Sequence, residues 1–247
     1  MQAFSGCERL FLVSSPKVEL DYNNAPAWQG REKHHRAAIG AALDAGVKHI
    51  YYTSLAFANP SKAPVMRCHS LTEDYLHDLE KEGRLTITII REGLYNEGWP
   101  LAFGYYFDMK NDTRSEIVVA GDGPMSWASI ADLTFGTAHI LAAPSERYAG
   151  KTLTMSATQT LTLKQIAEIV GKIKGHELQL KFVSKEQFVD YYAERGVPRE
   201  GIEWWVGAYE AMEDGECINT DSTLEDFLEK AGRTPQSLEA TIEEMMK

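Results

Sequence analysis

Short apolar runs alternate with amphipathic helical patterns through most of this chain, and that alternation most constrains its fold. Runs rich in apolar and β-branched residues occupy positions 10–15, 49–55 and 85–93, and helical patterns occupy 29–45 and 67–82 between them. Strands that alternate with helices at this spacing favour βαβ units, in which helices cover both faces of a parallel sheet. We therefore predict an α/β fold with a Rossmann-like parallel sheet.

The pattern changes towards the C-terminus. Beyond about residue 178 one short strand-like run is followed by helical segments, which predicts a small, mostly helical lobe packed on the sheet. We therefore divide the chain into a sheet-based domain, residues 1–157, and a mostly helical lobe, residues 158–247. Before that point, further strands are predicted over 116–123 and 151–157, and further helices over 130–142 and 162–174.

Charge and cysteine content exclude several classes of protein. Acidic residues outnumber basic ones by 36 to 25, and a net charge of −11 repels nucleic acid and anionic membranes. No stretch approaches the ~20 apolar residues of a membrane helix. Cys7, Cys68 and Cys217 have neither disulfide-framework nor metal-ligand spacing, so we expect a cytoplasmic protein without a metal site. Neither a Walker sequence nor a serine-hydrolase motif occurs.

Polar residues follow the first three strands at the point where each one ends. Ligands of open parallel sheets bind at the carboxyl ends of the strands, so these residues are candidates for one crevice. Any serine or threonine among them can instead simply end a strand and cap the next helix, but recurrence after three strands favours a site. The residues that close these strands are Ser14, Ser15 and Pro16, then Thr53, Ser54 and Leu55, then Gly93, Leu94, Tyr95 and Asn96.

The sequence resembles the NmrA-like branch of the atypical short-chain dehydrogenases/reductases, which includes NADPH:quinone oxidoreductases and fungal secondary-metabolism reductases. The likeness runs in one order from about residue 3 to the C-terminus. It is carried by LFLVSSP (10–16), HRAAIGAALDAGVKHIYYTSL (35–55), HSLTEDYL (69–76), ITIIREGLYNEG (87–98), GDGPMSWASIADLTFGTAHIL (121–141) and LTLKQIAEIVGK (161–172).

The resemblance implies NADP (NADPH) as the cofactor, with residues 1–157 as a partial nucleotide-binding domain and residues 158–247 as a substrate-binding lobe. It also implies roles for single positions. The segment that matches Ser14 and Ser15 lines the cofactor crevice in the family, and the position of Lys33 reaches the cofactor in at least one relative. The stretch that matches Gly93 to Asn96 packs beside the nicotinamide.

The usual catalytic pair of the wider family is replaced in this chain. His69 stands where that family has its lysine, and Val65 stands where it has its tyrosine. A proton for a reduced carbonyl must then come from Tyr95, His69 or Ser54, unless the acceptor, like a quinone, needs no strong acid. His69 is also a candidate for contact with the cofactor, although a histidine near a helix start is often solvated or a cap.

The family's opening strand, glycine-rich turn and helix have no match in this chain, so we expect an N-terminally truncated version of the fold. Three explanations stay open: a longer true protein, a genuine truncation that pairs its edge in an oligomer, or a cofactor-free role. The run at 10–15 then becomes a sheet edge, and an apolar edge invites pairing with another chain, such as a homo-oligomer partner.

The leading functional hypothesis is an NAD(P)H-dependent oxidoreductase that reduces a small carbonyl, enone, imine or quinone in fungal-type secondary metabolite biosynthesis. One alternative is a redox-sensing regulator that binds dinucleotide without turnover. The other is a cofactor-free isomerase or cyclase on the same scaffold. In each case we expect a small-molecule ligand and neither nucleic acid nor membrane as partner.

Overall fold

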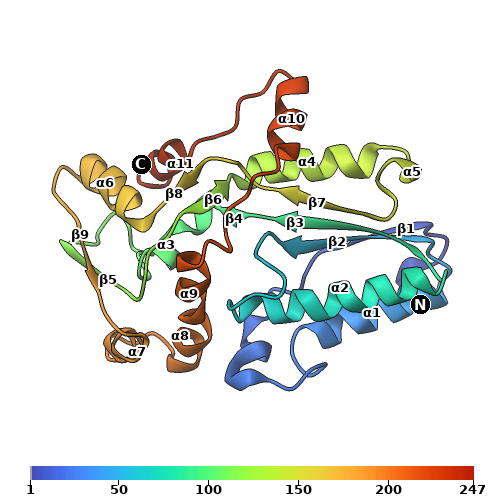
Figure 1. Ribbon diagram of the computed structural model, residues 1–247, viewed down its shortest axis with the longest axis horizontal. Helices are drawn as coiled ribbons and strands as arrows, with labels where there is room; N and C mark the ends of the chain where they lie inside the picture. The colour runs from blue at the N-terminus through green and yellow to red at the C-terminus, as the bar shows by residue number, and fades with distance from the viewer. Residues whose placement is uncertain (1) are drawn as a thin grey trace.

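The computed structural model describes residues 2–247, and its centre is a four-stranded parallel sheet. The strands are β1 (Arg9–Leu12), β2 (His49–Leu55), β3 (Thr86–Glu92) and β7 (Lys151–Met155), in the spatial order β1-β2-β3-β7. Helices α1 (Glu32–Asp44) and α2 (Val65–Lys81) cover one face (Figure 1). Helices α4 (Ile130–Ala142) and α10 (Thr223–Lys230) cover the other (Figure 1). The predicted α/β class with a parallel sheet and helices on both faces is confirmed.

Strand alternation explains why both faces are buried. Ile50 and Tyr52 of β2 pack in the core under α1 and α2, together with Ile87 and Ile89 of β3. Tyr51 lies between the first two and packs instead in the core under α4 and α10. Continuous apolar runs in β2 and β3 are therefore what a doubly covered parallel sheet requires.

Strand β1 lies at the edge of the main sheet, as we predicted from the sequence. Within residues 2–247 it pairs only with β2, with Phe11 opposite Tyr51. Its side chains alternate between exposed and half-buried, and Phe11 and Val13 remain 38% and 60% exposed. The edge leaves backbone groups and apolar side chains free to meet another strand.

A second lobe is built from small sheets and short helices. Strand β4 (Leu94–Tyr95) pairs with β6 (Met125–Ala128), which also pairs with β8 (Thr160–Leu161). Strand β5 (Glu116–Val119) pairs with β9 (Gln179–Phe182). The division at residue 157 stays a prediction, and these pairings join residues from both sides of it. The lobe's helices are α3 (Trp99–Ala102), α6 (Leu163–Lys174), α7 (Lys185–Ala193), α8 (Arg199–Trp205), α9 (Gly207–Glu213) and α11 (Leu238–Met245).

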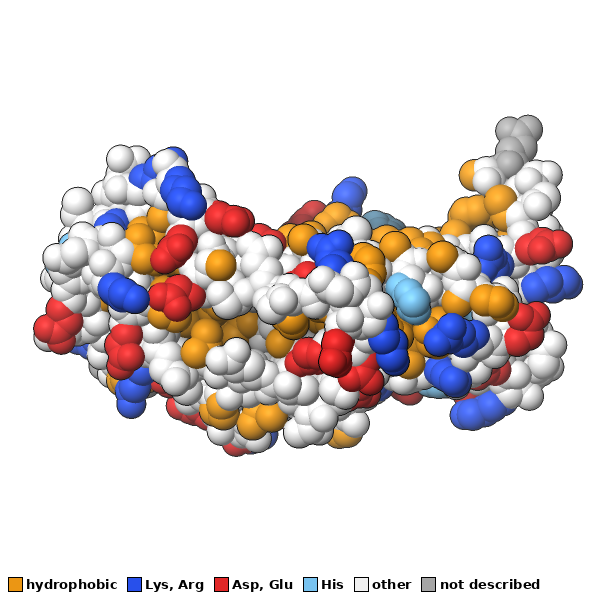
Figure 2. Space-filling model, turned by 90° about the horizontal axis from the view of Figure 1, so that it is seen from above, with side chains coloured by type: hydrophobic (Ala, Val, Ile, Leu, Met, Phe, Trp, Pro, Cys, Tyr) orange, Lys and Arg blue, Asp and Glu red, His pale blue; other side chains and the backbone are white. Residues whose placement is uncertain are grey.

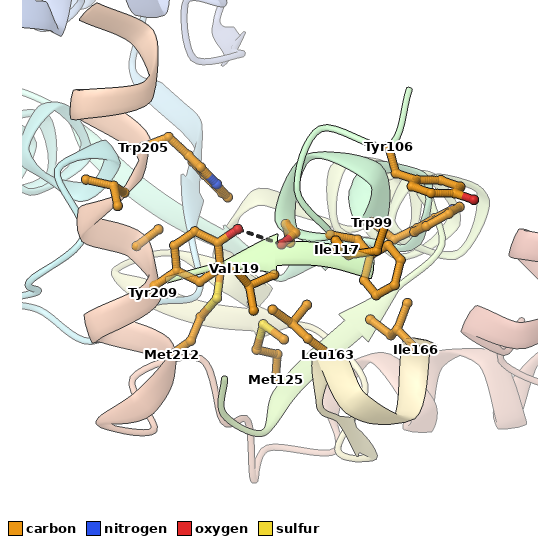
Figure 3. Packing of buried hydrophobic residues seen from close by; sticks show 14 of the residues in the cluster. Trp99, Tyr106, Ile117, Val119, Met125, Leu163, Ile166, Trp205, Tyr209 and Met212 are labelled. Atoms are coloured by element: carbon orange, nitrogen blue, oxygen red, sulfur yellow. Dashed lines mark hydrogen bonds between the residues drawn. The ribbon is translucent and has the colours of Figure 1, made fainter. Parts of the chain in front are cut away.

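The second lobe has its own apolar core. Figure 3 shows Trp99 and Tyr106 on one side of this core and Trp205 and Tyr209 on the other, with Ile117 of β5 between them. The Tyr209 hydroxyl donates to the Ala102 carbonyl (2.9 Å), which ties α9 to α3. This core holds α8 and α9 against the carboxyl ends of the main strands.

Local signals in the sequence set several helix ends. Thr162 and Gln165 form a capping box at the start of α6, in which the Thr162 side chain accepts from the Gln165 N–H. Gly175 ends the same helix in the left-handed conformation, with φ +73°. The remaining short elements are η1 (Gln2–Phe4), η2 (Val18–Asn24), η3 (Asn96–Gly98) and α5 (Ser145–Tyr148).

The surface is elongated and carries mixed charge. Figure 2 shows basic and acidic side chains interspersed over one face, with hydrophobic side chains reaching the surface between them. In the described part of the chain, no helix is both long and apolar enough to cross a membrane.

Candidate functional site

An apolar cavity lies where β2 and β3 end and the second lobe begins. Its volume is about 160 Å³, well below the ~300 Å³ at which typical ligand pockets begin, so it admits a single ring. Four aromatic residues belong to its wall, and the remaining wall is aliphatic or glycine. The lining residues are Leu55, Phe57, Val65, Gly93, Leu94, Tyr95, Gly98, Leu101, Ala102, Trp127 and Trp205.

Three larger hollows among the described residues are poorer candidates, and one of them, about 450 Å³, is an open depression lined mainly by charged residues of α7 and α8. The largest, about 660 Å³, is an open surface depression between α6 and β9, remote from the strand ends. Another, about 340 Å³, lies beside the cavity and includes Arg91, whose guanidinium is already paired with Glu73. We choose the smaller cavity because apolar walls at the carboxyl ends of parallel strands can exclude water from a reacting ring.

The chain positions this cavity by crossing from one sheet to the other. After β3 the backbone leaves the main sheet, and Leu94 and Tyr95 pair with Trp127 and Ala128 of β6. Gly93 stands at the crossing, where its N–H donates to the Met155 carbonyl (2.8 Å). A β-carbon at Gly93 would overlap the Ser156 side chain, so only glycine allows the two strands to approach this closely.

Tyr95 and Glu92 form the polar part of the site. The Tyr95 hydroxyl donates to Oε2 of Glu92 (2.7 Å), and the tyrosine is 38% exposed. Burial raises the pKa of the Glu92 carboxyl, while the hydrogen bond from Tyr95 opposes that shift. Burial and the nearby Glu92 charge raise the pKa of the Tyr95 phenol. Sequence reasoning selected Tyr95 and missed Glu92, whose signal was a carboxylate at the last position of a strand rich in β-branched residues.

Ser14 and Ser15 lie at the end of β1, among residues of α1 and α2 rather than in the cavity wall. The Ser15 N–H donates to Nε2 of His35 (2.8 Å), so this nitrogen is the acceptor and Nδ1–H donates to Thr72 Oγ1 (2.9 Å). Ser14 Oγ lies 3.3 Å from the same Nε2, and the Ser14 N–H donates to Thr53 Oγ1 (3.0 Å). Burial lowers the pKa of His35 to about 4, and the charge of Arg31 acts in the same direction.

Ser54 and His69 are both buried. Ser54 directly precedes the cavity residue Leu55, and its Oγ has no hydrogen-bond partner among the described residues. His69 is 1% exposed on α2, where its Nδ1 accepts from the Tyr52 hydroxyl (3.1 Å). Burial holds the pKa of His69 well below its usual value. His69 therefore lies inside the α2–β2 packing, away from the residues that line the cavity.

Asn96 and Lys33 lie outside the cavity wall. The Asn96 amide donates to the Gln236 carbonyl (3.0 Å) and to Thr241 Oγ1 (3.1 Å), which ties the crossing segment to α11. Lys33 is exposed on α1. The predicted strand-end residues thus fall into two groups: Leu55, Gly93, Leu94 and Tyr95 line the cavity, and the others lie outside its wall.

Helix starts near the strand ends already carry carboxylates of this chain. At the start of α1, Glu32 accepts from the N–H groups of Trp28 and Gly30, and Asp21 accepts from that of Arg31. At the start of α4, Glu97 accepts from the Ile130 N–H. An anion such as a phosphate is repelled from both positions, so they offer no diphosphate site. Residues 3–247 also bring no three His, Cys, Asp or Glu side chains into a metal-binding group.

Comparison with known proteins gives one family and several relatives. The model of the NmrA-like family matches residues 3–239. The chain is 29% identical over 240 residues to an NmrA-like family domain-containing oxidoreductase of Aspergillus flavus, covering 95% of this chain and 72% of that protein. It is also 29% identical over 202 residues to quinone oxidoreductase 2 of Escherichia coli, covering 79% of this chain and 62% of that protein.

Solved structures show the same fold. An NADPH-dependent quinone oxidoreductase of Escherichia coli in complex with NADPH superimposes with a TM-score of 0.79 at 24% identity, covering 100% of this chain and 79% of that one. Triphenylmethane reductase of Citrobacter in complex with NADP(H) superimposes with a TM-score of 0.77 at 25% identity, covering 98% and 78%.

Proposed function

The chain belongs to the NmrA-like family, as the sequence resemblance predicted, and we propose that it is an NADPH-dependent oxidoreductase that reduces a flat, apolar acceptor. One observation of the structure carries this proposal: a ring-sized cavity, walled by aromatic side chains, at the carboxyl ends of β2 and β3. The two curated relatives are named as oxidoreductases, and both structural neighbours are described with a bound nicotinamide dinucleotide.

The residues present fit the nicotinamide end of this cofactor. Gly93 and Leu94 give a flat, uncharged wall. Ser54, which directly precedes the cavity residue Leu55, holds a buried hydroxyl without a hydrogen-bond partner among the described residues. Together with Ser14 and Ser15 at the neighbouring strand end, these are the residues we expect to hold the cofactor. The cofactor supplies a hydride; this chain's own residues orient the rings, exclude water and hold a proton on Tyr95.

The cavity selects the acceptor by shape and polarity. Phe57, Trp127 and Trp205 offer aromatic surfaces that stack on planar rings, and no charged side chain lines the space. A quinone, enone, imine or small carbonyl compound meets these demands, whereas a sugar or a carboxylate does not. A place in secondary metabolite biosynthesis remains part of the proposal.

Two measurements test the proposed function. Calorimetric titration with NADPH is expected to show binding, and a panel of small quinones and enals is expected to include acceptors that oxidise NADPH. No binding heat and no oxidation with any acceptor would refute the proposal.

A variant that fills the cavity tests whether the reaction takes place there. A β-carbon at Gly98 makes only ordinary contact, so Gly98→Leu is expected to fill the cavity and lower kcat/KM at least about tenfold. Gly40→Leu on α1 is the matched control, because a β-carbon added at Gly40 would meet nothing within 4 Å. Equal turnover by Gly98→Leu and wild type would place the reaction elsewhere.

A further inference from the structure

Glu92 occupies a position that the proposed reaction leaves unexplained. It is the last residue of β3, and its carboxylate accepts a hydrogen bond from the hydroxyl of Tyr95, three residues further on. Its backbone carbonyl accepts from the Ala56 N–H (2.7 Å), and it directly precedes Gly93 of the cavity wall. A carboxylate in this place directs the one phenol that lines the cavity.

Among the neighbours of the Glu92 carboxylate, Tyr95 is the residue that forms a side-chain hydrogen bond with it. Its strand neighbours in register, Leu55 on β2 and Met155 on β7, carry no charge. The preceding residue, Arg91, is committed to Glu73 on α2 through Nε (3.0 Å) and Nη2. On the side of α4, the carboxylate of Glu97 is bonded to the Ile130 N–H. No basic side chain of the described residues forms an ion pair with Glu92.

We infer that Glu92 is a positioning residue that switches Tyr95 between two hydrogen-bonding directions, an inference that rests on the proposed function. When Glu92 is ionised, it accepts a hydrogen bond from the Tyr95 hydroxyl, and the phenol O–H then points away from the acceptor. When Glu92 is protonated, its carboxyl donates to the phenol oxygen, and the phenol O–H is free to donate to the acceptor.

The proton steps balance in the protonated form. As the acceptor carbon gains a hydride, the electron pair of its C=O bond moves to oxygen, and that oxygen takes the proton of Tyr95. The phenol oxygen then takes the carboxyl proton of Glu92. Water returns a proton to the carboxylate when the product leaves. Burial favours the protonated carboxyl because it raises the pKa of Glu92.

A spectroscopic test needs no cofactor. In protein labelled with ¹³C at the tyrosine ζ carbons, the signal missing from Tyr95→Phe identifies Tyr95. Its titration midpoint is expected to fall by at least about one pH unit in Glu92→Gln, because a neighbouring carboxylate opposes phenolate formation. Glu97→Gln removes a nearby carboxylate that bonds the α4 backbone, so its Tyr95 midpoint is expected to match that of wild type. Equal midpoints in wild type and Glu92→Gln would overturn the inference.

The pH profile of turnover separates the two proposals. Wild-type kcat/KM is expected to fall as pH rises through the pKa of Glu92, and Glu92→Gln is expected to lose that fall, because its amide donates to Tyr95 at every pH. Identical profiles in wild type and Glu92→Gln, with NADPH oxidised by both, would refute the role of Glu92 alone. Absence of NADPH oxidation in the wild type would instead refute the proposed function.

Discussion

Acid is expected to destabilise this protein through His35, and the effect can be isolated with a single substitution. His35 is 2% exposed, and its two ring nitrogens are committed to one accepted and one donated hydrogen bond. Protonation would place a second N–H on Nε2, facing the Ser15 N–H. It would also bury a positive charge near Arg31. The native state therefore strongly prefers the neutral ring.

The sign and size follow from proton linkage. The pKa of His35 is about 4 in the folded chain and 6.5 in an exposed histidine, so the unfolded state binds the proton more readily. The stability contributed by the neutral ring is complete above pH 6.5 and is lost as pH falls towards 4. Two and a half pKa units correspond to about 3 kcal/mol in total, and about 2 kcal/mol of it disappears between about pH 7 and pH 5.

Urea unfolding of wild type and His35→Gln across this pH range measures the effect. Glutamine does not titrate, so the difference in unfolding free energy between the two proteins is expected to shrink by about 2 kcal/mol from about pH 7 to pH 5. Subtraction removes the contributions of His69 and the carboxylates, which both proteins share. His34→Gln, one position earlier and exposed, is expected to leave the pH dependence unchanged. A pH-independent difference for His35→Gln would refute the reasoning.

Two other predictions concern the strand crossing and the sheet edge. Gly93→Ala is expected to lower the unfolding free energy by about 1–3 kcal/mol in thermal or urea unfolding, because its β-carbon overlaps Ser156. Gly40→Ala, in an uncrowded helical position, is expected to raise it by about 0.5–1 kcal/mol, and equal effects at the two glycines would contradict the packing argument. We also propose that β1 pairs with a second copy of this chain. Val13→Lys is then expected to reduce the mass measured by light scattering, and a wild-type protein that stays monomeric at high concentration would rule the pairing out.

The fold was readable from the sequence because local patterns and the global structure agree. Apolar-rich runs such as 49–55 are compatible with a strand covered on both faces. Thr162 begins α6 and Gly175 ends it, each through local geometry alone. The predicted helix over 130–142 coincides with α4. These features depend on residues a few positions apart, so tertiary packing had little to add.

The site could be predicted only in part, because the direction in which a side chain points depends on residues that are distant in sequence. Serine at the ends of β1 and β2 looked equivalent in sequence. The structure directs Ser14 towards His35 of α1 and buries Ser54 without a partner. Asn96 looked like a ligand for a small molecule, yet its amide meets Thr241, which is 145 positions away.

The sequence by itself determined the class of fold, the order of its elements and the family, because periodicity and motif order are properties of neighbouring residues. Tertiary structure alone decided which strand-end residues share a cavity. It placed Trp205 of α8 opposite Leu94 and Tyr95, and it set Tyr95 against Glu92. These contacts form because the second lobe packs on the strand ends. That packing depends on many apolar contacts between residues distant in sequence, which no local sequence pattern predicts.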